Sequence, residues 1–600
     1  MKNDSANGVS RRQFIGQSML TAVSLGAASM LKPATAFSTG DTHARAKFRD
    51  PAAAAGKLNI LFIFTDQERY FRSWPNGFSL PGRERIQRSG VTFHNHYCPA
   101  TMCTSSRSVL ITGLQTADNR MFENCDVPWI KDLSTDVPTI GHMLRKAGYY
   151  TAYKGKWHLS RAFDENAERL LTKEMEAYGF ADYNSIGDLV GHQLGGYRFD
   201  HLIAGSAITW LRNIGRPLSD DSKPWALTVS LVNPHDVMYF NTDAPGESVQ
   251  DQGRQMKRAV RAPNHAFYKK EWDIEVPKSL TQSFDGPGRP AAHLEFLKMW
   301  DYVLGHVPLE EERWRRLNNF YLNSIRAVDL QILSILNELD ALQLSDRTII
   351  VFTSDHGEMG GAHGGLRGKG PTPYEECIHL PLHIVHPEVN GGQDCQALSG
   401  HIDLAPTLLS LAGVQSGQVA EFAGRDLPGK DLSTVLQKPA AAKVNAVRDG
   451  ILFTYNGLVT VDSAPLAGAV KAVAAGKDLP TALKSGGQPD LSKRGTVRTT
   501  FDGRYKFTRY FSPVQRNSPK TIDELYGNND VELFDLQTDP HEMINLAASK
   551  DQNQALVKTM SDKLETAIKT EIGVDNGREM PEVKGISWTL NSKLGQTVLD

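Results

Sequence analysis

Short apolar runs alternate with amphipathic segments along most of this chain. Runs typical of strands buried on both faces of a parallel sheet occupy residues 58–64, 225–232 and 348–353, and a further strand is predicted at 149–153. Apolar residues at helical spacing predict helices over residues 137–147 and 313–342. Because strands alternate with helices, we expect an α/β fold built on a mostly parallel sheet.

Two long segments interrupt this alternation. Residues from about 160 to 300 are rich in aromatic residues, proline, glycine and charge, and we interpret them as insertions around the mouth of a site. Residues 440–492 read as another irregular insertion. Beyond it, residues 498–509 have the alternating side-chain pattern of strands on both sides of Asp502-Gly503, which predicts a hairpin with its turn at these two residues.

Composition narrows the function classes. The chain has 600 residues, of which 40% are hydrophobic, so we expect a large domain and a smaller one. The formal net charge is −2, so the chain lacks the excess of positive charge that is typical of proteins that bind nucleic acid. After the N-terminus no apolar stretch is long enough to span a bilayer, so we expect no membrane association of the processed chain.

The N-terminal segment has the pattern of an export signal. Arg11-Arg12 is followed by Phe14 and a weakly apolar run, and Ala34-Thr35-Ala36 supplies small residues for cleavage. Residues 1–36 look like a twin-arginine signal peptide, with an ordinary Sec signal as the alternative, and residues 37–57 read as a linker. The expected partner is the twin-arginine translocase, and the expected location is the bacterial periplasm or the medium.

The cysteine count bears on this location. An oxidising compartment permits disulfides, and five cysteines leave at least one unpaired. Cys103 is the candidate for the unpaired thiol, and the pairing among Cys98, Cys125, Cys377 and Cys395 stays open.

Three polar side chains follow predicted strands directly. Asp66, His235 and Asp355 each come just after a strand, and ligands of such sheets lie beyond the carboxyl ends of the strands. Carboxylates from separate strands suit a divalent cation, which prefers oxygen ligands held by a rigid frame. Taken alone, an aspartate after a strand is more often a turn former or a helix N-cap.

Two motifs are more specific. Cys103-Thr104-Ser105-Ser106-Arg107 opens a run that ends in Thr112-Gly113, and Gly155-Lys156-Trp157-His158-Leu159 follows the strand at 149–153. Together they resemble the signature motifs of the sulfatase family. In that family a maturation enzyme oxidises the cysteine to formylglycine (3-oxoalanine), whose hydrated aldehyde is the nucleophile. Ser105 stands where the family usually has proline, and an unmodified Cys103 thiol is the alternative.

The resemblance implies one divalent metal ion. Its expected ligands are Asp66, Gln67, Asp355 and His356, together with the formylglycine at Cys103. The Asp-Gln and Asp-His pairs are similar to those of the branch that holds phosphonate monoester hydrolases and some aryl- and choline-type sulfatases. Ca2+ is the family default, but an imidazole ligand moves the preference toward Mn2+ or Zn2+, with Mg2+ as a further alternative.

The resemblance also implies catalytic roles. Arg107, Lys156 and Lys369 are expected to stabilise charge, and His158 and His235 to move protons. Asn124 lies twenty-one residues after Cys103, where the phosphonate hydrolase-like branch has an active-site asparagine; a turn asparagine is the alternative.

The implied fold is alkaline phosphatase-like. A large mixed, mostly parallel sheet between helices would form a catalytic domain over residues 58–435, and a smaller α+β subdomain with an antiparallel sheet would span residues 436–600. A turn motif at 539–546, after a strand at 532–536, resembles the family's C-terminal block.

The implied activity is hydrolysis of an aryl or small-molecule sulfate ester through a covalent sulfated enzyme. One alternative is a phosphonate monoester or phosphodiester hydrolase on the same scaffold. Another is a catalytically inactive, sulfatase-like binding protein.

Overall fold

The computed structural model describes residues 56–590, apart from residues 128, 164–169, 186, 189–191, 253–254, 478–480, 483–484 and 584–585. The predicted signal peptide and all but the end of the predicted linker lie outside the described residues. The described residues belong to one compact unit. All five cysteines are buried and free, so no disulfide forms within the described part of the chain.

Seven strands form one large sheet in the order β3-β4-β1-β5-β6-β2-β7. Neighbouring strands are parallel except around β6, which runs antiparallel to β5 and β2. The strands are β1 (Asn59–Asp66), β2 (Val91–Tyr97), β3 (Tyr150–Gly155), β4 (Trp225–Pro234), β5 (Thr348–Ser354), β6 (His379–Val385) and β7 (Gln393–Gly400). The predicted mixed, mostly parallel sheet is therefore confirmed.

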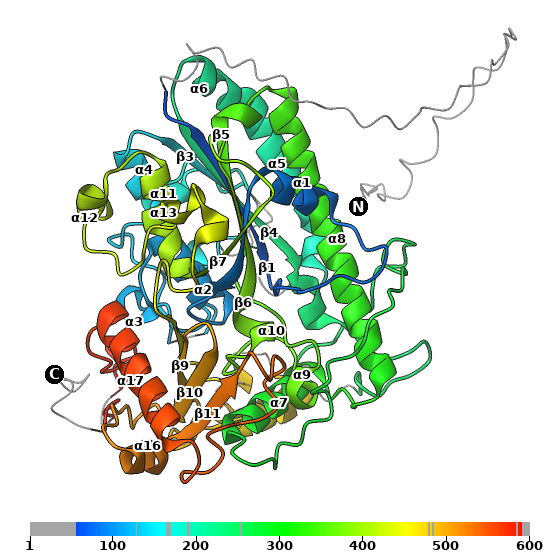
Figure 1. The fold of residues 1–600 in the computed structure, drawn as a ribbon. Helices are drawn as coiled ribbons and strands as arrows, with labels where there is room; N and C mark the ends of the chain where they lie inside the picture. The colour runs from blue at the N-terminus through cyan, green and yellow to red at the C-terminus, as the bar shows by residue number, and fades with distance from the viewer. Residues whose placement is uncertain are drawn as a thin grey trace, which may run out of the picture. The chain divides into compact units, whose positions relative to one another are not determined.

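Helices cover both faces of this sheet, as Figure 1 shows. Every residue of β1 is buried, and alternate side chains point to opposite faces, so Phe62 and Ile63 belong to different core clusters. The cluster with Phe62 includes residues of α4 (Ile140–Lys146) and α11 (Leu404–Leu411), and the cluster with Ile63 includes residues of α5 (Gly195–Trp210) and α8 (Glu311–Ala341).

The central strand sets the position of the polar residues. β1 lies between β4 and β5 and is parallel to both, with Asp66 opposite Pro234 and Thr65 opposite Ser354. The carboxyl ends of the three strands therefore meet. Asp66, His235 and Asp355 emerge at the same edge of the sheet.

The predicted helices differ from the observed ones at their ends. The helix expected at 313–342 is α8, which begins two residues earlier. The helix expected at 137–147 is α4, which begins only at Ile140, because the Thr139 hydroxyl accepts hydrogen bonds from the backbone N–H groups of Gly141 and His142 and caps the helix there.

A four-stranded antiparallel sheet follows in the order β11-β10-β9-β8. Its strands are β8 (Ile451–Tyr455), β9 (Thr496–Phe501), β10 (Tyr505–Phe511) and β11 (Asp530–Asp535), and the predicted hairpin is the β9–β10 pair. The last helix, α17 (Gln554–Glu571), packs on this sheet through Val557, Met560 and Leu564. The predicted smaller antiparallel sheet is thus confirmed; the boundary at residue 435 stays a prediction.

The other helices are shorter or peripheral. They are α1 (Pro81–Ser89), α2 (Cys103–Thr112), α3 (Thr116–Asn119), α6 (Arg216–Asp220), α7 (Ala291–Leu304), α9 (Ala362–Gly365), α10 (Glu375–Ile378), α12 (Val419–Ala423), α13 (Ser433–Leu436), α14 (Ala464–Ala474) and α16 (Ile522–Asn528). Between residues 240 and 290 the described residues form no helix or named strand, which agrees with the weak periodicity there. No helix of the described chain is long and apolar enough to cross a membrane.

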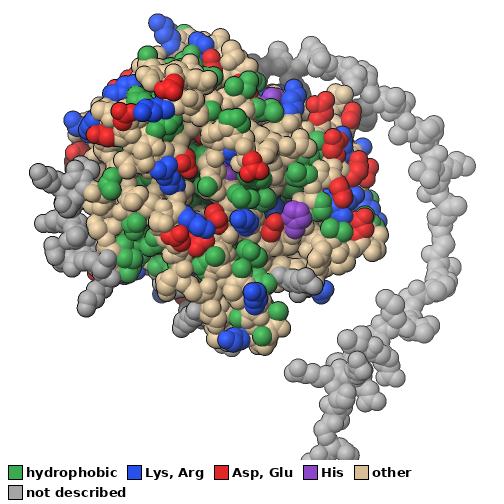
Figure 2. Space-filling view, turned by 90° about the horizontal axis from the view of Figure 1, so that it is seen from below, with side chains coloured by type: hydrophobic (Ala, Val, Ile, Leu, Met, Phe, Trp, Pro, Cys, Tyr) green, Lys and Arg blue, Asp and Glu red, His purple; other side chains and the backbone are tan. Residues whose placement is uncertain are grey.

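The surface carries charges of both signs. On the face shown in Figure 2, lysine and arginine side chains are interspersed with aspartate and glutamate rather than gathered into one large basic area.

Candidate active site

Four buried donor groups converge at the carboxyl edge of the large sheet. One ligand atom from each of Asp66, Cys103, Asp355 and His356 lies within 4.8 Å of the others, and all four residues are buried. The Cys103 Sγ lies 3.2 Å from the His356 Nε2 and 3.7 Å from the Asp66 Oδ1. The structure thus brings together four of the five predicted metal-ligand positions.

The start of α2 presents Cys103 to this cluster. Cys103 is the first helical residue, and Met102 before it has a φ of 75°, which turns the chain sharply into the helix. The Asn124 side-chain oxygen accepts a hydrogen bond from the Thr104 N–H, 3.3 Å away. Asn124 therefore satisfies one of the free N–H groups at the helix start, so it holds the segment that carries Cys103 in place.

Arg107 binds the two aspartates to each other. Its Nη2 donates to the Asp66 Oδ2 at 2.8 Å and its Nε donates to the Asp355 Oδ2 at 2.9 Å. Its Nη1 donates to the Lys156 carbonyl and to the Ser230 hydroxyl. All three guanidinium nitrogens are thus used within the protein, and Arg107 acts as a positioning residue for the carboxylates.

Two lysines add positive charge beside Cys103. The Lys156 Nζ donates to the Asp66 Oδ2 at 2.6 Å, and the Lys369 Nζ donates to the Gln67 Oε1 at 2.7 Å. Burial would lower the pKa of Lys156, but Asp66 and Cys103 raise it above its ordinary value, so this lysine stays charged.

Gln67 is held by its neighbours on every side. Its backbone N–H donates to the Asp355 Oδ1, its side-chain Nε2 donates to Glu358, and its side-chain oxygen faces Lys369. Its φ of 73° is in the left-handed region, which few residues other than glycine adopt. Gln67 lies next to the four-residue cluster, and its side-chain oxygen is bound by Lys369.

The donor set fits a divalent cation. The His356 Nδ1 lies 3.0 Å from the Gly357 carbonyl, so it carries the proton, and the lone pair of Nε2 faces the two aspartates at 3.6 Å each. Burial raises the pKa of Asp66, but Lys156, His235 and Arg107 bring it well below the ordinary value. An imidazole and two carboxylates are ligands that such an ion accepts.

The Cys103 thiol is in an activating environment. Burial and Asp66 raise its pKa, but Lys156, Lys369 and His356 bring it below the ordinary value for a thiol. The start of α2 also favours the thiolate form of Cys103, because the free N–H groups there attract negative charge.

The two predicted proton-transfer histidines are buried and uncharged. Burial, and after it Lys156, lowers the pKa of both His158 and His235 well below the ordinary value. Neither ring nitrogen of His158 has a hydrogen-bond partner, and its φ of 58° places the residue in the left-handed region.

Asp188 explains the strained backbone at His158 and was not anticipated from the sequence. Its carboxylate accepts hydrogen bonds from the backbone N–H groups of Trp157 at 2.5 Å and His158 at 2.6 Å. It lies in the irregular segment after residue 160, where no motif marks it. Glu358 accepts hydrogen bonds from the Gln67 side chain and from the N–H groups of Gly360 and Gly368. It lies two residues after His356, so its closeness to a predicted ligand in the sequence could have identified it.

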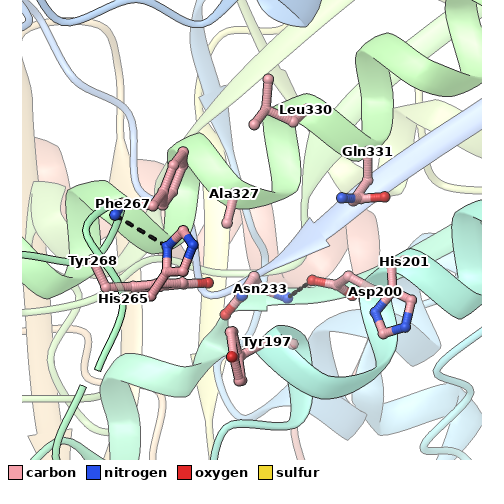
Figure 3. Close-up of a pocket in the computed structure, with 11 residues that line it drawn as sticks. Tyr197, Asp200, His201, Asn233, His265, Phe267, Tyr268, Ala327, Leu330 and Gln331 are labelled. Atoms are coloured by element: carbon pink, nitrogen blue, oxygen red, sulfur yellow. Dashed lines mark hydrogen bonds between the residues drawn. The ribbon is translucent and has the colours of Figure 1, made fainter. Parts of the chain in front are cut away.

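A cavity of about 270 Å³ lies between α5 and α8. Figure 3 shows His201, His265, Tyr268 and Asn233 around it, and the Asn233 N–H donates to the Asp200 carboxylate at 2.9 Å. Neither Cys103 nor any predicted metal ligand lines this cavity, so it is separate from the cluster.

A comparison with protein families decides what this arrangement belongs to. The family described as Sulfatase matches residues 58–414, which is more than half of the chain. The protein belongs to the sulfatase family. The matched range contains every predicted site residue, and the family relationship makes the chain a sulfatase-family hydrolase that is expected to use a divalent metal and formylglycine.

Individual relatives agree with this assignment. A choline-sulfatase of Rhizobium meliloti is 27% identical over 391 residues, which cover 61% of this chain and 69% of the relative. Among solved structures, a 2-O GAG sulfatase superposes with a TM-score of 0.60 at 17% identity and covers 90% of this chain and 96% of that chain. A phosphonate monoester hydrolase of Agrobacterium radiobacter superposes with a TM-score of 0.59 at 18% identity, covering 88% and 100%. At these identities the two structures establish the fold, which is the predicted alkaline phosphatase-like one.

Proposed function

We propose that this protein hydrolyses sulfate monoesters of phenols or other small alcohols, with Cys103 as formylglycine. The observation that carries the proposal is the convergence of Asp66, Asp355 and His356 on the Cys103 side chain. Lys156 and Lys369 lie beside the same group and supply the positive charge that a sulfate ester needs. Membership of the sulfatase family supports the same reaction class.

Asp66, Asp355 and His356 would hold the divalent ion beside the side chain at position 103. Gln67 remains a predicted ligand whose side-chain oxygen accepts a hydrogen bond from Lys369. When bound, the ion would act as a Lewis acid toward oxygen, and the formylglycine hydrate would supply one hydroxyl for attack on sulfur and a second for release of sulfate. Arg107 keeps the two carboxylates at their spacing with hydrogen bonds of 2.8 and 2.9 Å.

The remaining residues bind charge and move protons. Lys156 and Lys369 are buried, so their attraction for a sulfate group is weakly screened, and one such donor is worth about 3 kcal/mol toward the developing charge. His158 has both ring nitrogens without partners, and its proposed role is to take a proton from a hydroxyl at position 103. His235 is neutral in the protein; the negative charge of a bound ester favours its protonated form, which can then protonate the leaving oxygen.

Mass spectrometry of the tryptic peptide 89–107 tests this proposal. An aldehyde at residue 103 that forms a hydrazone is the expected result, together with loss of nitrophenyl sulfate turnover in Cys103→Ala. An intact, alkylatable thiol in a fully active enzyme would refute the formylglycine. Binding of a sulfated ligand without any turnover, unchanged in Cys103→Ala, would instead identify an inactive binding protein.

A second candidate is hydrolysis of phosphonate monoesters or phosphodiesters. It is favoured by the Asp66-Gln67 and Asp355-His356 pairs, which resemble those of the phosphonate hydrolase-like branch. The contact of Asn124 with the Thr104 N–H at the start of α2 also favours it. Parallel assays with nitrophenyl sulfate and nitrophenyl phenylphosphonate separate the two reactions. Near-zero turnover of the sulfate beside rapid turnover of the phosphonate would reverse our order of preference.

We further propose that the chain is matured by a formylglycine-generating enzyme in the cytoplasm and then exported, folded, by the twin-arginine translocase. Replacing Arg11 and Arg12 with lysine should leave active enzyme in the cytoplasmic fraction. Export of the double variant at the normal level would favour the Sec route.

A further inference from the structure

A second group of buried donor atoms lies outside the site described above. One ligand atom from each of His363, Glu376 and Glu542 lies within 4.8 Å of the others. His363 belongs to α9, Glu376 to α10, and Glu542 to the turn after β11. Figure 1 shows α9 and α10 beside the smaller sheet, so the group joins the loop after β5 to the C-terminal part of the chain.

The His363 ring is oriented with a free lone pair toward the carboxylates. Its Nδ1 lies 2.9 Å from the Gln282 Oε1, which accepts its proton, and its ring stacks on Tyr374 with centroids 3.6 Å apart. The Nε2 is fully buried, has no hydrogen-bond partner and lies 3.7 Å from the Glu376 Oε2. A lone pair held against a carboxylate is unfavourable unless a proton or a cation lies between them. Histidine ligands of metals have the same arrangement, with the other ring nitrogen donating to a carbonyl.

The carboxylate oxygens of this group are not all satisfied by their protein neighbours. The Glu376 Oε2 has no hydrogen-bond partner. Glu542 shares one cation, the Lys506 ammonium, with Glu375, at 2.8 Å from each. Two further cations lie nearby: the charge of Arg69 acts on Glu376, and Arg289 donates to the His363 carbonyl.

We propose that His363, Glu376 and Glu542 bind a second divalent cation, of the Zn2+ or Mn2+ class. One imidazole and two carboxylates form a donor set that such ions accept, with a fourth position left for water. Two ligands at about 2.1 Å from a tetrahedral ion lie about 3.4 Å apart, and the observed 3.7 Å between the His363 Nε2 and the Glu376 Oε2 needs only a small closure.

The position of this site gives it a structural role. The Glu358 N–H donates to the Glu376 carbonyl and the Gly357 N–H donates to the Cys377 carbonyl, so the cation would brace the loop that carries His356 and Lys369. The Glu542 Oε2 also accepts from the Glu375 N–H at 2.7 Å, which places the C-terminal turn against the same loop. The inference does not depend on the sulfatase reaction or on the state of Cys103.

Zinc loading of the full-length protein tests the site. Protein stripped with a chelator and titrated with Zn2+ alone should bind about two equivalents, as measured by calorimetry and by metal analysis after gel filtration. The double variant Asp66→Asn/Asp355→Asn should keep about one equivalent. His363→Gln or Glu376→Gln in that background should remove it, with at least a tenfold weaker affinity.

His386→Gln is the matched control, because His386 is a half-buried histidine just after β6, outside the proposed group, and its Nδ1 accepts from the Glu388 N–H. It should leave both equivalents in place. Folded Asp66→Asn/Asp355→Asn protein that binds no Zn2+ would overturn the proposal, as would unchanged zinc binding in His363→Gln. If the His363 and Glu376 variants do not fold, a wild-type protein that never exceeds one equivalent is sufficient to reject it.

Discussion

Arg107 offers the sharpest test of how the site is built. Its guanidinium makes two charge-assisted hydrogen bonds, to Asp66 and to Asp355, and its side chain is only 1% exposed. Arg107→Met would leave Asp66 paired with Lys156. Asp355 would lose its arginine partner and among basic side chains keep only the His356 ring, 3.6 Å away. Removing one partner of a buried ion pair costs about 3–5 kcal/mol.

This cost translates into a measurable change in melting temperature. With an unfolding entropy of about 2.1 cal/mol/K per residue, a unit of about 540 residues loses roughly 1 °C per kcal/mol. We therefore expect the metal-free Arg107→Met protein to melt about 3–5 °C below the metal-free wild type at one scan rate. A divalent ion supplies the lost positive charge, so saturating metal should recover at least half of the difference.

The control is Arg212→Met. Arg212 also donates two short hydrogen bonds to one carboxylate, that of Glu338. Its side chain is 59% exposed, so solvent screens the pair and Arg212→Met should change the melting temperature little. The reasoning is refuted if the metal-free Arg107→Met protein melts within 1 °C of the wild type. It is equally refuted if metal recovers none of the loss.

Three further predictions address charge, titration and maturation. Lys369→Met should lower kcat/KM for a sulfate ester about 100- to 1000-fold, because it removes one buried cation, while the melting temperature changes little. Burial, offset in part by the N–H groups of Val232 and Asn233, raises the pKa of Asp200 to about 8. The unfolded chain loses this proton near pH 4 and the folded chain near pH 8, so Asp200 makes the protein less stable as pH rises through that window. The melting temperature of Asp200→Asn minus that of the wild type should therefore increase as the pH rises from 5 to 8. A difference that does not change with pH would contradict the raised pKa. Ser105→Pro should raise the formylglycine fraction in the 89–107 peptide without loss of folding, since proline is tolerated in the first turn of a helix and the Ser105 hydroxyl has no partner.

The sequence by itself determined which residues lie at the edge of the large sheet. A continuous apolar run makes a buried strand, and the residue after it must emerge at the strand end, so the positions of Asp66, His235 and Asp355 followed from local pattern alone. The cysteine and lysine-histidine motifs determined the family in the same way, because their residues are close in sequence.

Only the tertiary structure decided which of these side chains contact one another. The bonds of Arg107 run to Asp355, 248 residues away, and Asp188 holds the His158 backbone from a segment without any motif. The group of His363, Glu376 and Glu542 likewise joins segments that share no local pattern. The physical reason is that a side chain's partners depend on how distant elements pack and on how buried charge is then satisfied, whereas periodicity and motif spacing report only on the element itself.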